Sequence, residues 1–312
     1  MSRHPANPRS RPARGTGEIL VTGSTGFLGR EVCRQLSEGN RRFRALVRIH
    51  SNRDVLRGTG AWMTEGDLTE RKSLDGPMED VHTVLHLGAL VRSADSEANR
   101  RVNVDGTRNV LDAAEQAGAV RVIAVSSDSV LRNKRSPYAE TKAEAEALVL
   151  AWGRDAGRSS VVLRPPLILG RGSNHLASLE RLSRVPFLPL PAGTAPRCPV
   201  WVGDVAAALI RAIDLPDEGL PAQAIDLPGD SEVSLEQILR TIARAQNRRA
   251  PRIRMVSDTK LRSLARLAGS RFSEILEGLG ERVTLDPAPA RDLLDWHPLS
   301  LEDLIDRSVG GL

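Results

Sequence analysis

Residues 19–29 read Ile-Leu-Val-Thr-Gly-Ser-Thr-Gly-Phe-Leu-Gly, an apolar run followed by glycines at every third position. The apolar run predicts a buried strand over 19–21, and the residues after the second glycine predict a helix over 27–38. A glycine-rich turn at this junction brings the backbone close to a pyrophosphate and points the positive end of the helix dipole at it. The stretch therefore predicts a dinucleotide-binding loop, with an ordinary glycine-rich turn as the alternative. The contacts would come from Gly23, Thr25, Gly26, Phe27, Leu28 and Gly29.

Beyond this loop, short apolar runs alternate with longer amphipathic segments. Strands separated by helices of this length pair in parallel through right-handed crossovers, which place helices on both faces of the sheet. The pattern predicts an α/β fold, a doubly wound parallel Rossmann sheet with a smaller C-terminal substrate lobe. Further strands are predicted at 43–47, 61–64, 81–87, 121–125 and 161–163, and further helices at 95–117 and 138–156.

The pattern becomes irregular after residue 166. Proline and glycine are frequent through 165–199, which predicts a loop-rich segment over a site. Alternation then returns, with strands predicted at 200–202 and 224–227, helices at 204–214 and 234–246, and short helices beyond, one of them from near Pro287. We expect a disordered basic tail at 1–17, a dinucleotide-binding Rossmann domain at 18–165, and a substrate-binding lobe at 166–312 of which 200–228 returns to the Rossmann core.

The charge of the chain does not indicate a nucleic-acid partner. The formal net charge is +5, but residues 1–17 contain four arginines and no acid, so the remaining body is close to neutral. No apolar run approaches the length of a membrane span, and the two cysteines have no disulfide or metal-binding spacing. We therefore expect a cytoplasmic protein with a small-molecule substrate and with no nucleic-acid, membrane or metal partner.

The end of the second predicted strand bears on the choice of cofactor. A carboxylate there binds the ribose 2′-hydroxyl of NAD, whereas a cation favours the 2′-phosphate of NADP. Residues 43–47 are followed by Arg48, and no carboxylate occurs before Asp54. Arg48 thus predicts NADP, with NAD less favoured. The alternative for Arg48 is a solvated surface arginine.

A tyrosine and a lysine share one face of the helix predicted at 138–156. Tyr138 is the only tyrosine of the chain, and Lys142 follows four residues later. An ammonium stabilises a phenolate, so Lys142 would lower the pKa of Tyr138 toward the range in which a general acid or base works. Ser127, beyond the strand at 121–125, would orient a substrate oxygen. The alternatives are a strand-end cap for Ser127 and an exposed pair at the start of a helix for the other two.

These motifs together resemble the extended branch of the short-chain dehydrogenase/reductase superfamily, the NAD(P)-dependent epimerases, dehydratases and reductases. The resemblance runs from residue 18 to about 305 and includes Gly66-Asp67-Leu68, His86-Leu-Gly-Ala89, Asn103-Val-Asp-Gly-Thr107, Leu163-Arg-Pro-Pro166 and Val200-Trp-Val-Gly-Asp204. It implies that Ser127, Tyr138 and Lys142 are catalytic. Further cofactor contacts are expected from Asp67, Leu68, Leu87, Gly88, Ala89, Asn103, Tyr138, Lys142 and Pro165. Substrate contacts are expected from Ser127, from Asn174, and from Arg197, which stands where sugar-nucleotide members carry an arginine for the diphosphate.

The chain departs from this family in three places. Val130-Leu131-Arg132 stands where the family has Val-Tyr-Gly, the interval from Ser127 to Tyr138 is short, and the second strand is not followed by an acid. The short interval indicates a trimmed loop and a more open or smaller site. The missing acid argues against 4-epimerases that hold NAD permanently.

The expected function is NAD(P)-dependent hydride transfer at a secondary alcohol or ketone, with a nucleotide sugar as the leading substrate. A reductase of a lipid-like or steroid-like ketone is the second expectation. A non-catalytic NADPH-binding scaffold or sensor subunit is the third, and the intact serine, tyrosine and lysine argue against it. By analogy with the family, a homodimer would form through the helices at 95–117 and 138–156.

Overall fold

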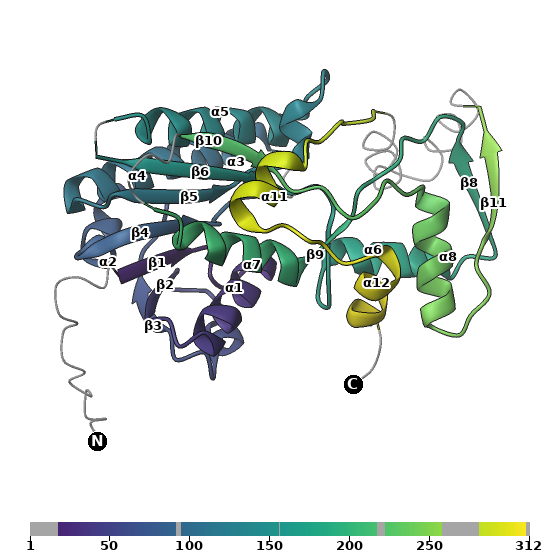
Figure 1. Cartoon of the computed structure of the whole chain (residues 1–312), viewed down its shortest axis with the longest axis horizontal. Helices are drawn as coiled ribbons and strands as arrows, with labels where there is room; N and C mark the ends of the chain where they lie inside the picture. The colour runs from purple at the N-terminus through teal and green to yellow at the C-terminus, as the bar shows by residue number, and fades with distance from the viewer. Residues whose placement is uncertain (1–17, 92–94, 156, 217–221, 258–280, 310–312) are drawn as a thin grey trace.

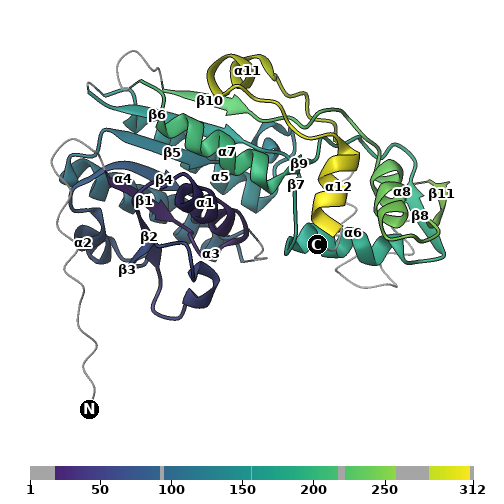
Figure 2. The ribbon, with the colours of Figure 1, turned by 60° about the horizontal axis from the view of Figure 1, so that its bottom comes forward.

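The computed structural model describes residues 18–91, 95–155, 157–216, 222–257 and 281–309 (Figure 1). The basic tail predicted at 1–17 lies outside these residues, as does the part of the predicted C-terminal helices that falls in 258–280. A body of sheet and helices occupies one end of the molecule and a smaller lobe the other, as Figures 1 and 2 show. No helix in the described part of the chain combines the length and the apolar character needed to cross a membrane.

Seven strands form one sheet in which every pairing is parallel, which confirms the predicted fold class. The strand order is β10-β6-β5-β4-β1-β2-β3, so the chain order reverses beside β1. Such a reversal opens a crevice at the carboxyl ends of the strands, where ligands of these sheets bind. The strands are β1 (Glu18–Thr22), β2 (Phe43–Val47), β3 (Trp62–Glu65), β4 (Val81–His86), β5 (Arg121–Val125), β6 (Ser159–Arg164) and β10 (Gln223–Asp226).

Helices cover both faces of this sheet. Because side chains alternate along a strand, Ile19 and Val21 of β1 pack into the core on one face, whereas Leu20 packs into the core on the other. Both cores exclude water, so they hold the carboxyl edge of the sheet rigid. The first core is covered by α1 (Phe27–Glu38), α7 (Val202–Ile213) and α11 (Ala288–Leu294), and the second by α4 (Gly106–Ala117) and α5 (Pro137–Trp152).

The helix predicted at 95–117 is interrupted. It consists of α3 (Ser96–Arg100), a π-helical turn (Arg101–Asp105) and α4. Single π turns inside α-helices are frequent at functional sites. The helix predicted at 138–156 begins one residue earlier, where the Ser136 side chain accepts a hydrogen bond from Ala139 N, and it ends at Trp152.

The prediction of a loop-rich segment at 165–199 is wrong. This segment contains β7 (Ile168–Leu169), α6 (Asn174–Ser183) and β8 (Phe187–Pro191). The prolines of β8 concealed the strand, since proline has no N–H to give to a ladder; β8 tolerates them because it pairs on one side only, with β11 (Arg252–Val256). The lobe has its own core, to which α6, α8 (Leu235–Ala245) and α12 (Leu301–Val309) contribute, and β7 pairs with β9 (Val200–Trp201).

Candidate active site

The glycine loop follows β1 and forms the tight turn that the sequence predicts. Gly23 is left-handed (φ +65°), and Gly26 N donates to its carbonyl oxygen at 2.9 Å. A Cβ atom on Gly29 would lie 2.1 Å from the Gly23 oxygen, and one on Gly23 would lie 2.7 Å from Gly88 N, so no side chain has room at either position. α1 begins at Phe27, and its first N–H groups have no helical acceptor. The loop therefore offers the close backbone approach and the free amide donors that a dinucleotide pyrophosphate needs.

Two buried hydroxyls, which the sequence reading missed, hold this loop in place. Thr22 Oγ1 accepts hydrogen bonds from the N–H groups of Leu87 (3.2 Å) and Gly88 (3.1 Å). Ser24 Oγ donates to the carbonyl oxygen of Leu46 at 2.8 Å, which joins the loop to β2. The sequence contained one indication of this role, because Thr22 and Ser24 are polar residues on either side of Gly23 at the end of an apolar strand.

His86 is a buried link between the sheet and α4. Its Nδ1 is hydrogen bonded with the hydroxyl of Thr22 at 2.9 Å and its Nε2 with that of Thr107 at 3.0 Å. Burial, and then the nearby Lys142 ammonium, lowers the pKa of His86 to about 3. The imidazole is therefore neutral at physiological pH, and its role here is to position β1, β4 and α4 at the crevice.

The residues predicted beside the adenine lie on the loops after β3 and β4. Asp67 Oδ1 accepts hydrogen bonds from the backbone N–H (2.9 Å) and the hydroxyl (2.8 Å) of Thr69, so this carboxylate stabilises its own turn. Leu68 is buried against Gly88, where a Cβ atom would lie 2.6 Å from Leu68 Cδ1. The contact of Asp67, Leu68, Leu87, Gly88 and Ala89 with an adenine ring or its ribose stays a prediction.

Arg48 stands at the end of β2, next to the strand that carries the glycine loop. Its side chain is exposed, and its backbone N–H donates to Ser51 Oγ at 3.1 Å, which closes a tight turn. The next carboxylate, Asp54, is paired with Arg57 at 2.9 Å. This turn therefore presents a guanidinium where an NAD-selective chain would present a carboxylate.

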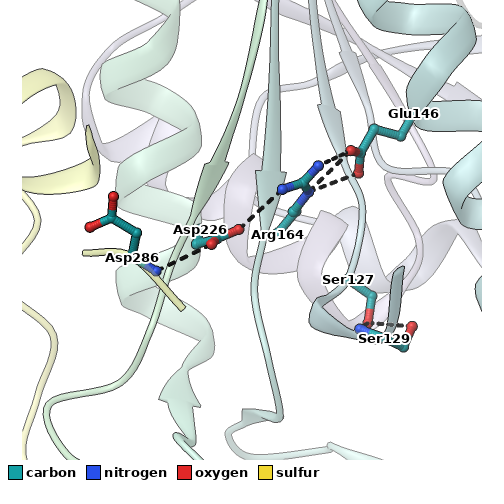
Figure 3. Close-up of polar contacts among 6 residues, drawn as sticks. All are labelled: Ser127, Ser129, Glu146, Arg164, Asp226 and Asp286. Atoms are coloured by element: carbon teal, nitrogen blue, oxygen red, sulfur yellow. Dashed lines mark hydrogen bonds and ion pairs between the residues drawn. The ribbon is translucent and has the colours of Figure 1, made fainter. Parts of the chain in front are cut away.

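Ser127 lies just beyond β5, at the carboxyl edge of the sheet (Figure 3). Its Oγ accepts hydrogen bonds from the backbone N–H (3.2 Å) and the hydroxyl (3.0 Å) of Ser129, and it donates to Asp128 Oδ1 at 3.2 Å. The two accepted bonds fix the oxygen, and its proton is directed at Asp128. Ser127 also caps the short 3-10 turn Asp128–Leu131, so a capping role and a substrate role are compatible. Its neighbour Ser126 is buried.

Tyr138, the second residue of α5, is half-buried. Burial, and then the Asp128 carboxylate, raises the pKa of Tyr138 to about 12. The prediction that this pKa is lowered overall is wrong, because burial and a neighbouring anion, which favour the neutral phenol, outweigh any contribution from Lys142. Asp128 accepts a hydrogen bond from Ser127, and its charge also acts on Tyr138, so the two predicted catalytic hydroxyls lie near one carboxylate.

Lys142 is buried one turn further along α5. Its Nζ donates to the carbonyl oxygen of Val125, at the end of β5, at 2.7 Å. Burial lowers the pKa of Lys142 to about 8, and the carboxylate of Glu146 opposes this shift. The ammonium is thus still the major form at pH 7, and its hydrogen bond to the strand end holds it one turn from Tyr138.

A chain of paired charges that the sequence reading missed, buried or partly buried, runs from Glu146 on α5 to the ends of β6 and β10 (Figure 3). Glu146 forms an ion pair with Arg164 at the end of β6, and Arg164 also reaches Asp226 of β10 at 3.5 Å. Asp226 in turn accepts a hydrogen bond from Asp286 N at 3.3 Å, on a segment that returns from the lobe. Buried charges are stable only when they are paired. The network therefore fixes α5, the ends of β6 and β10, and the returning segment relative to one another.

Asn103 and Pro165 join loops around this site. Asn103, predicted to contact the cofactor, uses its amide within the protein: Oδ1 accepts from Leu90 N (2.7 Å), and Nδ2 donates to Leu90 O and to Thr141 Oγ1 (both 3.1 Å). It thereby clamps the loop after β4 to α5. Pro165 O accepts a hydrogen bond from Asp128 N at 3.2 Å. Contacts of Asn103 and Pro165 with a cofactor stay predictions.

The structure brings Arg197 to the site. Burial, and then Arg132, lowers the pKa of Arg197, while Asp128 opposes this shift, so the two guanidiniums lie close to the same carboxylate. Arg197 Nη1 donates to the carbonyl oxygen of Glu281 at 3.3 Å. Asn174, in contrast, is exposed at the first position of α6, and none of the contacts described for this part of the chain joins it to the catalytic residues.

Comparison with known proteins agrees with this geometry. The NAD dependent epimerase/dehydratase family matches residues 19–227. A ceramide reductase from Caulobacter vibrioides is 32% identical over 91% of this chain and 87% of its own, and a UDP-glucose 4-epimerase from Vibrio cholerae is 27% identical over 90% of each. The structure of a UDP-glucose 4-epimerase from Brucella ovis in complex with NAD shares the fold, with a TM-score of 0.75 and 22% identity over 94% of this chain and 97% of that one. The motifs read from the sequence and the fold that carries them are thus those of one group of enzymes, and the chain belongs to the NAD-dependent epimerase/dehydratase family.

Proposed function

We propose that this chain is an NADP(H)-dependent ketone reductase whose substrate carries an acyl chain. The observation that carries the proposal is a phenol that keeps its proton, Tyr138, flanking the same carboxylate as the Ser127 hydroxyl at the carboxyl edge of the sheet. A bound reduced nicotinamide supplies a hydride to a carbonyl carbon. The oxygen then needs a proton, and a phenol with a pKa of about 12 is in its proton-donating form at neutral pH.

Each of the three predicted catalytic residues has a separate task in this reaction. The Ser127 proton turns from Asp128 to the carbonyl oxygen and orients it. Tyr138 Oη gives its proton to the same oxygen as negative charge develops there. The Lys142 ammonium, one turn away on α5, stabilises the resulting phenolate until a proton returns from solvent. Oxidation in the reverse direction would need a phenolate at the start, which burial of Tyr138 disfavours.

An acyl-chain substrate is favoured by the surface beside the site. Leu131 and Val91, on the loops after β5 and β4, are exposed apolar residues, 38% and 50% accessible. They offer a hydrocarbon chain a contact that a sugar does not need. The relative with 32% identity over most of the chain is a ceramide reductase, which acts on such a molecule by name.

A nucleotide sugar, the leading substrate from the sequence, remains the second candidate. Arg197 and Arg132 place two guanidiniums near the catalytic serine, an arrangement that suits a diphosphate. The UDP-glucose 4-epimerase relative also covers most of this chain.

Turnover assays with two substrate classes separate these candidates. We expect the purified chain to oxidise NADPH when it is mixed with a long-chain 3-oxo amide, and not when it is mixed with UDP-glucose. Loss of NADPH absorbance measures the first reaction, and chromatography of the sugar nucleotides measures the second. Conversion of UDP-glucose to its 4-epimer, with no oxidation of NADPH by the keto amide, would contradict the proposal.

Preference for NADP(H) should depend on Arg48. We expect Arg48→Ala to weaken NADPH binding about tenfold, because a charged hydrogen bond contributes roughly 1.5 kcal/mol, and to leave NADH binding unchanged. Fluorescence titration of both coenzymes measures this. Arg57→Ala, at an exposed position in the segment that follows, is the matched control and should change neither affinity. If Arg48→Ala lowered the affinity for NADPH and for NADH equally, Arg48 would not be a ligand of the 2′-phosphate.

Three further expectations belong with this proposal. We infer a cytoplasmic enzyme, a homodimer through the face formed by α4 and α5, and a division into a dinucleotide-binding part at 18–165 and a substrate-binding part at 166–312. The pairing of β10 with β6 supports the return of 200–228 to the Rossmann core.

A further inference from the structure

The end of the lobe carries a concentration of positive charge that no acidic residue within it offsets. We define the lobe tip as residues 181–187 and 248–256, which contain six arginines and no aspartate or glutamate. The chain apart from its basic tail is close to neutral, so this charge is a local feature. The arginines are Arg181, Arg184, Arg248, Arg249, Arg252 and Arg254, and all six are exposed.

The two segments of the lobe tip lie side by side. β11 pairs with β8 in parallel over its whole length, and Arg252 N donates to Pro186 O at 3.1 Å where the pairing begins. Gln246 Nε2 donates to Glu180 Oε1 at 2.7 Å, which joins the ends of α8 and α6 just behind the tip. In Figures 1 and 2 this region is the end of the molecule farthest from the seven-stranded sheet.

Apolar side chains are exposed among these arginines. Phe187 and Met255 are 51% and 54% accessible, although large apolar side chains are usually buried. Phe187 is in register with Arg252, so both project from the same face of the two-stranded sheet, whereas Met255 is in register with Leu190 and projects from the other face. Leu188 and Leu190, at the alternate positions of β8, are buried in the lobe core. The outer face of β8 and β11 therefore combines cations with an exposed aromatic ring.

We propose that the lobe tip docks on the surface of a membrane that contains anionic phospholipids. Such a surface attracts a cluster of arginines, and each cation near it contributes roughly 1 kcal/mol. Phe187, on the same face as Arg252, then enters the boundary between headgroups and acyl chains, where apolar side chains flanked by cations are stable. A single-stranded nucleic acid stacks successive bases on several aromatic rings, whereas the lobe tip contains only one, Phe187.

Membrane docking by the lobe tip does not depend on the substrate or on the reaction. The sequence predicted no membrane partner because it contains no apolar run that could span a bilayer, but a peripheral docking surface needs no such run. The lobe tip is formed by short segments from two parts of the chain, which only the fold brings together.

Co-sedimentation with vesicles tests the proposal with the full chain. We expect binding to vesicles made of equal parts phosphatidylglycerol and phosphatidylcholine, and none to phosphatidylcholine alone. Substituting Arg248→Gln, Arg252→Gln and Arg254→Gln together should lower the partition coefficient about a hundredfold. The matched control, with Arg42→Gln, Arg154→Gln and Arg291→Gln, removes the same charge from exposed positions elsewhere and should bind as the wild type does. The basic tail is identical in every variant, so it does not contribute to these differences.

Substituting the exposed aromatic ring tests insertion separately. Phe187→Ser should weaken vesicle binding by a similar factor at high and at low salt, because salt screens the arginines and not the apolar contact. Absence of binding by the wild type, equal losses in the two arginine variants, or no effect of Phe187→Ser would each overturn the proposal. So would tighter binding to a single-stranded oligonucleotide than to the vesicles, if the tip arginine variant lost it.

Discussion

Replacing Tyr138 by phenylalanine is expected to lower turnover on the order of a thousandfold, the effect of losing a general acid. The substitution removes one hydroxyl and keeps the ring, so the packing of α5 is preserved. It removes no charge at neutral pH either, because the pKa of Tyr138 is raised to about 12. Affinity for NADPH and the free energy of unfolding should therefore stay close to those of the wild type.

Three measurements on the same preparation check this result: steady-state turnover, fluorescence titration of NADPH, and urea unfolding. A large loss of turnover with intact coenzyme binding and intact stability would identify the phenol of Tyr138 as the donor of the proton to the substrate oxygen. If Tyr138→Phe turned over at nearly the wild-type rate, the proton donor would be another group, and the proposed reaction would lose its basis. If all three quantities fell together, Tyr138 would have a structural role only.

The glycine loop was predictable because its constraints are local. Gly23, Gly26 and Gly29 stand at fixed intervals after an apolar strand, and the structure has room for no side chain at the first and last of them. The same holds for the strands of the seven-stranded sheet, because each contains a short run of apolar residues. Ser127 was predicted from its place after a strand, and Tyr138 and Lys142 from their spacing; the structure places all three near the end of β5 and the start of α5, and their catalytic role stays a prediction.

The buried charge network was not predictable, because it joins residues that are far apart in the sequence. Arg164 and Asp226 are 62 residues apart and meet only because β10 pairs with β6. The pKa of Tyr138 was mispredicted for a related reason. The spacing of four residues correctly placed Lys142 on the same helix, but the burial of the phenol and the nearby Asp128 carboxylate, which raise its pKa, depend on the fold.

The lobe was the least predictable part of the fold. Prolines normally break strands, so the run Phe187–Pro191 did not suggest one. An edge strand with a single partner is an exception to this rule. Its partner here, β11, lies more than 60 residues further along the chain. The cluster of arginines at the lobe tip was hidden for the same reason.

Replacing Lys142 by methionine should reduce turnover by on the order of a hundredfold or more, because the phenolate formed at Tyr138 loses its neighbouring cation. The same variant tests the electrostatics of the site without any substrate. Lys142 is buried, which lowers its pKa to about 8 from the 10.5 of a lysine exposed to water. Between these two pH values the unfolded chain holds a proton on Lys142 that the folded chain has released, so the wild type becomes more stable as the pH rises through this window.

Methionine has no proton to release, so the stability of the wild type relative to Lys142→Met should improve by about 3 kcal/mol between pH 8 and pH 10.5. Below pH 8 the difference should be constant. Tyr138 also titrates differently in the folded and unfolded chains at high pH, but it does so in both proteins and cancels in the comparison. Urea unfolding at several pH values measures the difference, and Lys134→Met, at an exposed position, is the control that should show no such trend. A difference that did not change with pH would mean that the Lys142 ammonium is not desolvated, and its proposed role beside the phenol would then have no electrostatic basis.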